Sequence, residues 1–202
     1  VLGNATLALC WRIKPDRRLK RCQLQSKTET FQTRKLSKKP TSIKGVGFFN
    51  HMRAVIQRVA KAHVKVDNVT IGVIGTGLLV FLGVENKDTV EDIEWIAAKI
   101  PLLRIFEDDE ERMNRSVMDI DGDILVISQF TVYGNMRKGT RPSFNHAAKP
   151  EKGESDYESF VDCLSRNIGK PVPTGKFGAD MQIETINDGP VTLILDTKNK
   201  RF

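Results

Sequence analysis

The residues best suited to chemistry form short polar or glycine-bearing segments in the second half of the chain. The first is Ser128-Gln129-Phe130-Thr131, inside the otherwise apolar run from Ile124 to Val132. Hydroxyl and amide groups in a buried strand must be hydrogen-bonded, because an unpaired buried group costs stability. The segment therefore either supplies polar groups to a site or bonds to neighbouring backbone, with Gln129 facing solvent at a sheet edge.

Two further segments carry glycines next to cations or an aromatic ring. Lys138-Gly-Thr-Arg-Pro-Ser-Phe144 contains two cations, which suits either a bound phosphate or water. Thr174-Gly-Lys-Phe-Gly-Ala-Asp-Met181 sets Phe177 among glycines, a pattern of backbone that packs closely against a ligand or another strand. No histidine lies near Ser128 in sequence, so spacing gives no support to a Ser–His triad, although triad members need not be sequence neighbours.

The fourth segment is Asn187-Asp188-Gly189-Pro190, which precedes the apolar run Val191–Leu195. All four residue types favour turns, so the pattern predicts a tight turn between two last strands over 181–186 and 191–195.

Composition excludes several classes of protein. The three cysteines lack CxxC spacing and the three histidines are scattered, which argues against a disulfide scaffold and a metal site and favours a reducing compartment. No apolar run reaches the roughly 18 residues that a membrane span needs.

Charge divides the chain into two parts. Residues 1–51 hold 12 Lys and Arg and 2 acids, a net charge of about +10, whereas the remainder has 20 basic and 23 acidic residues, or −3. We interpret residues 1–51 as a basic extension, either a transit segment or a disordered tail, and residues 52–202 as the folded domain.

The folded domain is predicted to be mixed α/β. A helix is expected from an N-cap at Asp88, with Glu91 completing a capping box, to Pro101, and a second around Tyr157–Leu164. Strands are expected over 53–59, 63–66, 69–74, 78–84, 102–106 and 124–132, followed by the last two strands named above. The hairpins favour a mostly antiparallel or mixed sheet, and no glycine-rich nucleotide-phosphate loop is present.

Taken together, these segments resemble the D-aminoacyl-tRNA deacylase family. The resemblance rests on MRAVIQRV followed by a hairpin and GLLVFLGV, then SQFT, RPSF, TGKFGADM and NDGPVT, in this order, and covers residues 52 to about 196. It implies hydrolysis of the ester between a D-amino acid, or mischarged glycine, and the 3′-terminal adenosine of tRNA. It also implies a small β-barrel-like domain that works as a homodimer, without cofactor or metal.

The resemblance gives the Gly189-Pro190 segment a role beyond a turn. It implies a cis peptide bond whose motif reaches into the active site of the partner subunit. Two main-chain carbonyls would then hold the α-amino group of the substrate and leave no room for the side chain of an L-amino acid. Rejection by backbone would work for many side chains and would accept glycine.

Catalysis has two readings within this resemblance. Thr131, after Ser128, Gln129 and Phe130, is a candidate nucleophile, but a hydroxyl without an adjacent base is a weak one. Alternatively water attacks, assisted by the 2′-hydroxyl of the terminal ribose, and Gln129 with the N–H of Phe130 or Thr131 forms the oxyanion site.

Substrate binding is carried over to further positions. Thr192 would hydrogen-bond across the pocket, Arg58 would brace it, and Phe177 would contact the adenosine. The alternative functions are a nucleic-acid-binding protein or a synthetase-associated editing module of the same fold. We expect a cytoplasmic protein, with plastid or mitochondrial targeting by residues 1–51 as the open alternative.

Overall fold

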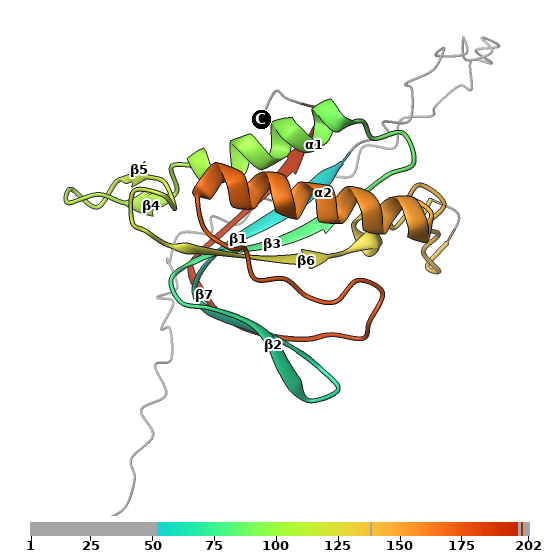
Figure 1. Ribbon diagram of the computed structural model, residues 1–202, viewed down its shortest axis with the longest axis horizontal. Coiled ribbons are helices and arrows are strands. Elements are labelled where there is room, and N and C mark those ends of the chain that lie inside the picture. The colour runs from blue at the N-terminus through green and yellow to red at the C-terminus, as the bar shows by residue number, and fades with distance from the viewer. Residues whose placement is uncertain (1–51, 138, 198, 200–202) are drawn as a thin grey trace, which may run out of the picture. The chain divides into compact units, whose positions relative to one another are not determined.

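The computed structural model describes residues 52–137, 139–197 and 199, and these form a mixed sheet with two helices on one face (Figure 1). The predicted extension, residues 1–51, and Lys138 lie outside the described residues. No helix in the described part of the chain is long and apolar enough to cross a membrane.

The elements follow one another in the order expected for a mixed α/β domain. The sheet contains β1 (Arg53–Val66), β2 (Val69–Ile74), β3 (Gly77–Gly83), β6 (Asp123–Ser128) and β7 (Gln182–Asp196). A small hairpin arm contains β4 (Phe106–Glu107) and β5 (Met113–Arg115). The helices are α1 (Val90–Lys99) and α2 (Pro150–Ile168), with the 3₁₀ turns η1 (Ile100–Leu102) and η2 (Phe130–Tyr133).

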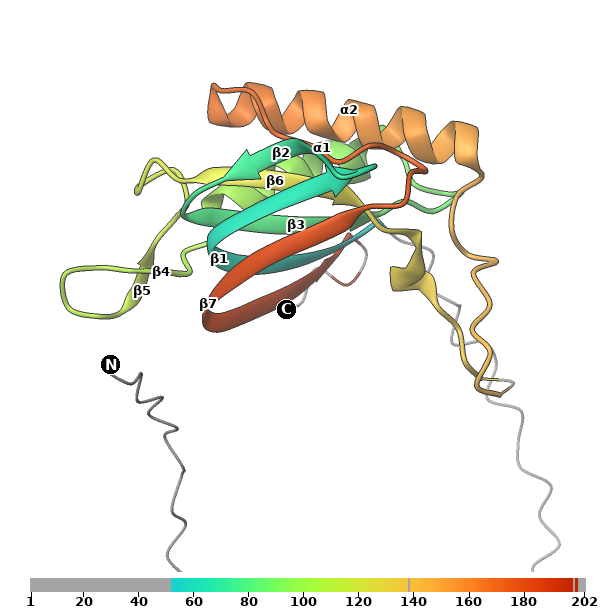
Figure 2. The same cartoon turned by 90° about the horizontal axis from the view of Figure 1, so that it is seen from below.

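The sheet is organised around β1, which is one long strand rather than the two that were predicted. Its first half pairs with β3, its second half with β2, and β7 runs along its other edge, all antiparallel. The β3–β6 pair is parallel, so the predicted mixed sheet is confirmed. Figure 2 shows the sheet curling, with β7 beneath it and α2 above.

Alternation along the central strands produces a core on each face of the sheet. Leu78, Val80 and Leu82 of β3 point to the cluster beneath the helices, and Leu79 points to a second cluster inside the curl. β6 behaves in the same way. The prediction that the run 78–84 is buried on both faces is therefore confirmed.

The predicted start of α1 is one residue too early. The N-cap is Thr89, whose N–H and hydroxyl both donate to Asp92 Oδ2, at 3.1 and 2.9 Å. Asp88 instead turns inward, where its Oδ2 accepts from the Glu85 N–H at 2.7 Å. Burial, opposed by that hydrogen bond, raises the pKa of Asp88 to about 7.

Three predicted strand boundaries are wrong. Residues 102–106 form no strand until Phe106, because Pro101 draws the chain into η1. The strand predicted over 124–132 ends at Ser128, and Phe130–Tyr133 form η2. The last two strands are one strand, β7, and Asp188–Val191 form a bulge within it rather than a turn between strands.

Candidate active site

A cleft of about 600 Å³ opens where the parallel strands β3 and β6 end. Ligands commonly bind at the carboxyl ends of neighbouring parallel strands, because loops diverge there and leave room. The lining includes the strand ends, the residues after β6, the start of α2 and the loop before β7: Leu82, Val84, Ile127–Phe130, Phe144, Ala147, Ala148, Pro150, Gly153, Tyr157, Phe177–Met181 and Ile183.

The end of β6 places Ser128, Gln129 and Phe130 in this lining. The Gln129 N–H donates to the Leu82 carbonyl at 2.7 Å, which holds the chain beside β3 before it turns into η2. Phe130 is 58% exposed and packs edge-on against Phe144, with ring centroids 5.1 Å apart. The first N–H groups of a helix have no acceptor within it. Phe130 and Thr131, which open η2, therefore offer such donors at the cleft.

Thr131 is exposed, and its hydroxyl accepts a hydrogen bond from the Gln129 side-chain amide. An amide cannot take up a proton as a general base, so this contact positions the hydroxyl without activating it. The turn itself is rigid, because the buried Tyr133 hydroxyl donates to the Gly83 carbonyl at 2.9 Å. Burial, reinforced by the nearby Asp88 charge, raises the pKa of Tyr133 well above its ordinary value.

Phe177 lines the cleft beside α2. Its ring lies 6.0 Å from that of Tyr157, and a Cβ added at Gly153 would come within 3.2 Å of Phe177 Cζ. The glycine in α2 therefore lets the Phe177 ring lie against the helix. Tyr157 donates its hydroxyl to the Val126 carbonyl at 2.9 Å, and burial raises its pKa, so it is a neutral structural donor.

The second group of predicted residues lies on β7 and β1. Between the pairs Gln57–Thr192 and Val59–Asn187, the single residue Arg58 faces four residues, Asp188–Val191, which bulge out of the strand. The Gly189–Pro190 peptide bond is cis, as predicted. Gly189 has φ of +117°, a conformation that strongly favours glycine.

Arg58 is buried behind this bulge and contacts its first residue, Asp188. Its guanidinium contacts Asp188 twice, with Nε 3.3 Å from the carbonyl oxygen and 3.0 Å from Oδ2. Nη1 donates to the Ile105 carbonyl at 2.7 Å, and Nη2 lies 3.7 Å from Glu107 Oε1. One cation thus ties the bulge to the start of the hairpin arm.

The structure brings the predicted residues into two separate groups. Ser128, Gln129, Phe130 and Phe177 line the cleft, with Thr131 beside them. Within the described protomer, the cleft lining includes none of the bulge group, Arg58, Gly189, Pro190 and Thr192. Thr192 is exposed next to the bulge, 3.5 Å from the Gln57 amide nitrogen.

Several lining residues were not singled out from sequence. Tyr157 was read only as a core position of α2, and Pro150 and Gly153 at the start of that helix were not considered. Helical spacing identifies the buried face of α2 but not the part of that face that extends past the sheet edge. The contact between Phe144 and Phe130 depends on the η2–α2 loop, whose path the sequence does not specify.

Comparison with known proteins shows the family to which the chain belongs. The family model described as D-Tyr-tRNA(Tyr) deacylase matches residues 55–196. Proteins named "D-aminoacyl-tRNA deacylase" from Opitutus terrae and Geobacter sulfurreducens are each 56% identical, over 146 and 149 residues. These alignments cover 72% and 74% of this chain and 97% of each relative.

Solved structures share the fold. A structure named "c-Myc DNA Unwinding Element Binding Protein" is 41% identical, with a TM-score of 0.68, over 71% of this chain and 97% of that chain. One named "Structural Analysis of a probable eukaryotic D-amino acid tRNA deacylase" has a TM-score of 0.63 at 20% identity. It covers 72% of this chain and 99% of the other, and supports the fold alone.

Proposed function

This chain belongs to the D-Tyr-tRNA(Tyr) deacylase family, and we propose that it hydrolyses the ester between a D-amino acid, or glycine, and the 3′-terminal adenosine of tRNA. The observation that carries the proposal is the family match from residue 55 to 196, which spans both the cleft segments and the bulge. The product pair is a free D-amino acid and a tRNA with a restored 3′-hydroxyl.

The donors at the end of β6 suit an oxyanion site. We propose that the ester carbonyl lies against the Gln129 amide and the N–H groups that open η2, and that Ser128 shapes the same wall. Water adds to the carbonyl carbon with help from the 2′-hydroxyl of the ribose, and the bond to the 3′-oxygen then breaks. We favour water over Thr131 because the hydroxyl of Thr131 contacts an amide rather than a base.

The two separate groups on one protomer support a homodimer. We propose that Gly189 and Pro190 of one copy enter the cleft of the other, where their carbonyls hold the α-amino group and exclude an L side chain. Exposed isoleucines flank the bulge on β7, Ile186 at 61% and Ile194 at 56%, and these favour burial against a second copy. In this arrangement Thr192 borders the partner's cleft and Phe177 faces the adenosine.

The activity is tested with matched D-tyrosyl-tRNA and L-tyrosyl-tRNA. Loss of the D ester with the L ester spared is the expected result. Survival of both esters would refute the proposed activity, and loss of both would refute chiral exclusion by the bulge.

The shared site is tested by mixing two inactive variants, Gln129→Ala in the cleft and Gly189→Val in the bulge. If the groups meet between copies, half of the randomly mixed dimers carry one intact site, so about a quarter of wild-type activity returns. Activity that stays at the level of the separate variants, while mass spectrometry shows mixed dimers, would place both groups in one protomer's site.

A second candidate function is nucleic-acid binding without hydrolysis. The 41% identical structure is named for DNA binding by that protein, and residues 1–51 here carry about +10. Deleting residues 1–51 would abolish nucleic-acid binding in that case, whereas a deacylase would keep its hydrolysis.

We propose that the protein acts in the cytoplasm, or in an organelle reached through residues 1–51.

A further inference from the structure

A set of cations borders the cleft without taking part in its proposed chemistry. Lys149 lies between the lining residues Ala148 and Pro150, Lys87 follows β3 after a short turn, and Arg141 belongs to the loop that delivers Phe144. All three are exposed, and none forms an ion pair with any residue that the structure describes. We call these three residues the cationic rim.

Lys87 and Lys149 lie on two backbone segments that are hydrogen-bonded to each other. The Asn86 side chain accepts from the Lys149 N–H at 3.1 Å and donates to the Ala147 carbonyl at 3.4 Å. Beside it, the Ala148 N–H donates to the Val84 carbonyl at 2.9 Å. These bonds fasten the backbone that carries Lys87 to the backbone that carries Lys149, directly behind the cleft wall.

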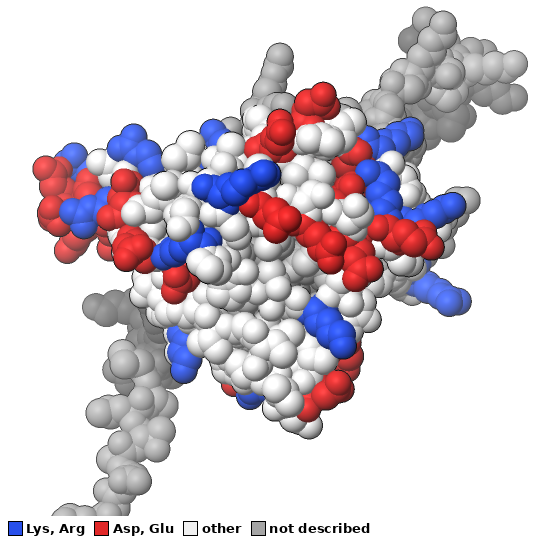
Figure 3. Space-filling model, viewed as in Figure 1, with Lys and Arg blue, Asp and Glu red and all other residues white. Residues whose placement is uncertain are grey.

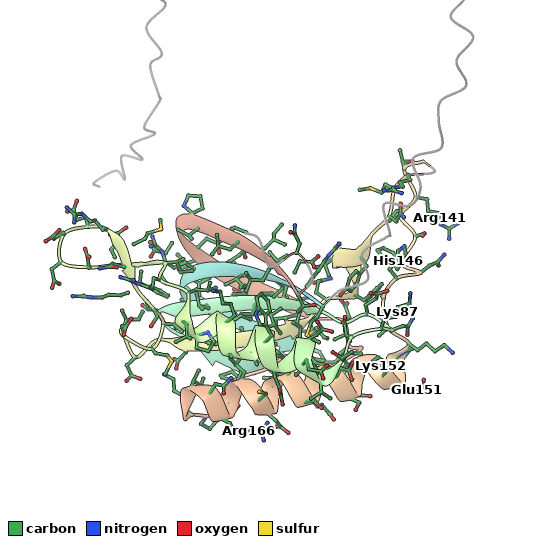
Figure 4. All side chains as sticks on the ribbon, turned by 90° about the horizontal axis from the view of Figure 1, so that it is seen from above. Lys87, Arg141, His146, Glu151, Lys152 and Arg166 are labelled. Atoms are coloured by element: carbon green, nitrogen blue, oxygen red, sulfur yellow. The ribbon has the colours of Figure 1, made fainter. Side chains whose placement is uncertain are left out.

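Arg141, the third cation, lies on a loop whose two ends are hydrogen-bonded to each other. Asn135 and Ser143 exchange backbone hydrogen bonds of 2.9 and 3.0 Å, which bring the two ends of the Arg141 loop together. Figure 4 shows Lys87 and Arg141 at the same end of the domain, with Arg166 at the other end of α2.

The charge around the rim is asymmetric. The outer face of α2 exposes acidic side chains along its length, and Figure 3 shows them as a red band across the helix. These are Glu151, Glu154, Glu158 and Asp162. A polyanion is repelled by this face and attracted to the rim, so approach to the cleft from the rim is favoured over approach across the outer face of α2.

We infer that the cationic rim binds the phosphates of the tRNA acceptor end. This inference rests on the proposed function, which puts the terminal ribose in the cleft. The phosphates of the preceding nucleotides then lie just outside the cleft mouth, where Lys87, Lys149 and Arg141 stand. The contacts are to backbone phosphate, so they serve all tRNAs alike and position the 3′ end without reading sequence.

The test removes two rim charges and compares a charge-matched control. The variant is Lys87→Ala with Lys149→Ala. Lys149 is the N-cap of α2 but makes no side-chain cap bond, so its removal spares the helix. The control is Lys99→Ala with Arg166→Ala, from the opposite ends of the same two helices. All proteins keep residues 1–51, so the contribution of that segment cancels.

The readouts are the dissociation constant of uncharged tRNA between 50 and 200 mM salt, and hydrolysis of D-tyrosyl-adenosine, which has no tRNA body. Each lost phosphate contact reduces the slope of log K against log salt by about 0.7, so the variant's slope falls by about 1.4. Between 50 and 200 mM salt, the factor by which affinity for tRNA falls is therefore roughly sevenfold smaller for the variant than for the wild type. Hydrolysis of the small ester stays at the wild-type rate, and the control behaves as wild type.

An unchanged salt slope in the rim variant, or an equal loss in the control, would overturn the inference. Loss of small-ester hydrolysis in the rim variant would also overturn it, because the lysines would then act in the cleft or in folding. If the wild-type protein hydrolyses neither D-tyrosyl-adenosine nor D-tyrosyl-tRNA, the proposed function is refuted instead. The salt dependence of tRNA binding would then still test the role of the rim.

Discussion

Replacing Arg58 by lysine tests whether the bulge must be held rigidly to discriminate D from L esters. Arg58 makes its contacts from a buried position, with only 4% of its surface exposed. It is the single residue of β1 that faces the four bulged residues of β7. A lysine keeps the charge, but its ammonium cannot reach both the Ile105 carbonyl and the Asp188 carboxylate as the planar guanidinium does.

The cost to folding can be estimated from these contacts. Losing one charge-assisted hydrogen bond at a buried position costs about 1.5–3 kcal/mol. In a domain of this size, each kcal/mol lowers Tm by about 2–4 °C, so we expect a decrease of roughly 5 °C and a folded variant. A displacement of about 1 Å at a positioning group costs up to 10²-fold in rate, so kcat/KM for the D ester falls about 10–100-fold.

The assay compares kcat/KM for D-tyrosyl-tRNA and L-tyrosyl-tRNA, and the decisive number is their ratio. Arg53→Lys is the matched control, because Arg53 also joins β1 to β7, through Asp196 at 2.9 Å, away from the bulge. We expect the D-to-L ratio to fall in Arg58→Lys and to stay unchanged in Arg53→Lys. A wild-type ratio in Arg58→Lys, or an equal fall in both variants, would refute the bracing role.

Three further predictions concern the cleft and its supports. Thr131→Val should leave kcat within about threefold of wild type if water attacks, whereas loss of a nucleophile would cost more than ~10³-fold in single-turnover assays. Asp88→Asn should stabilise the protein at pH 8 by on the order of 2 kcal/mol but little at pH 4, as measured by urea unfolding. The reason is that the pKa of Asp88 is 3.8 in the unfolded chain and about 7 in the folded protein, so the wild-type free energy of unfolding falls as pH rises between these values. Equal stabilisation by Asp88→Asn at pH 4 and pH 8 would contradict this. Gly83→Ala should lower the free energy of unfolding by about 1–3 kcal/mol, because the added methyl would meet Val132 and come within 2.8 Å of the Tyr133 ring. An unchanged urea midpoint would show that η2 can shift away from β3.

Much of the fold follows from local patterns in the sequence. Alternating and continuous apolar runs predict β3 and the first half of β1, because burial on one or both faces imposes a period of two. Helical spacing predicts α1 and α2. The two-residue turn Asp67-Asn68 is also predictable, since both residues adopt positive φ, which Asp and Asn tolerate.

The features that failed prediction depend on contacts distant in sequence. Asn187–Pro190 read as a turn, but β1 remains paired with β7 at Asn187 and at Thr192. The strand therefore continues, and Asp188–Val191 are forced outward opposite Arg58. Polar residues in SQFT read as part of a strand, yet η2 begins there because Tyr133 docks on Gly83. The family resemblance, read from the order of the motifs, implies both the cleft residues and a Gly189-Pro190 segment that serves the partner subunit, whereas composition and spacing alone indicate neither.

The separation of the two groups has a physical rationale in the proposed mechanism. Hydrolysis needs donors that fit a developing oxyanion, and these come from a strand end anchored by the Gln129–Leu82 hydrogen bond. Chiral exclusion needs only a rigid obstacle of fixed position, and backbone held by a buried arginine provides it. If the obstacle comes from a second copy, the site is complete only in the dimer. A free protomer would then lack both the carbonyls that hold the α-amino group and the obstacle that excludes L esters, so hydrolysis and chiral selection would arise together on dimerisation.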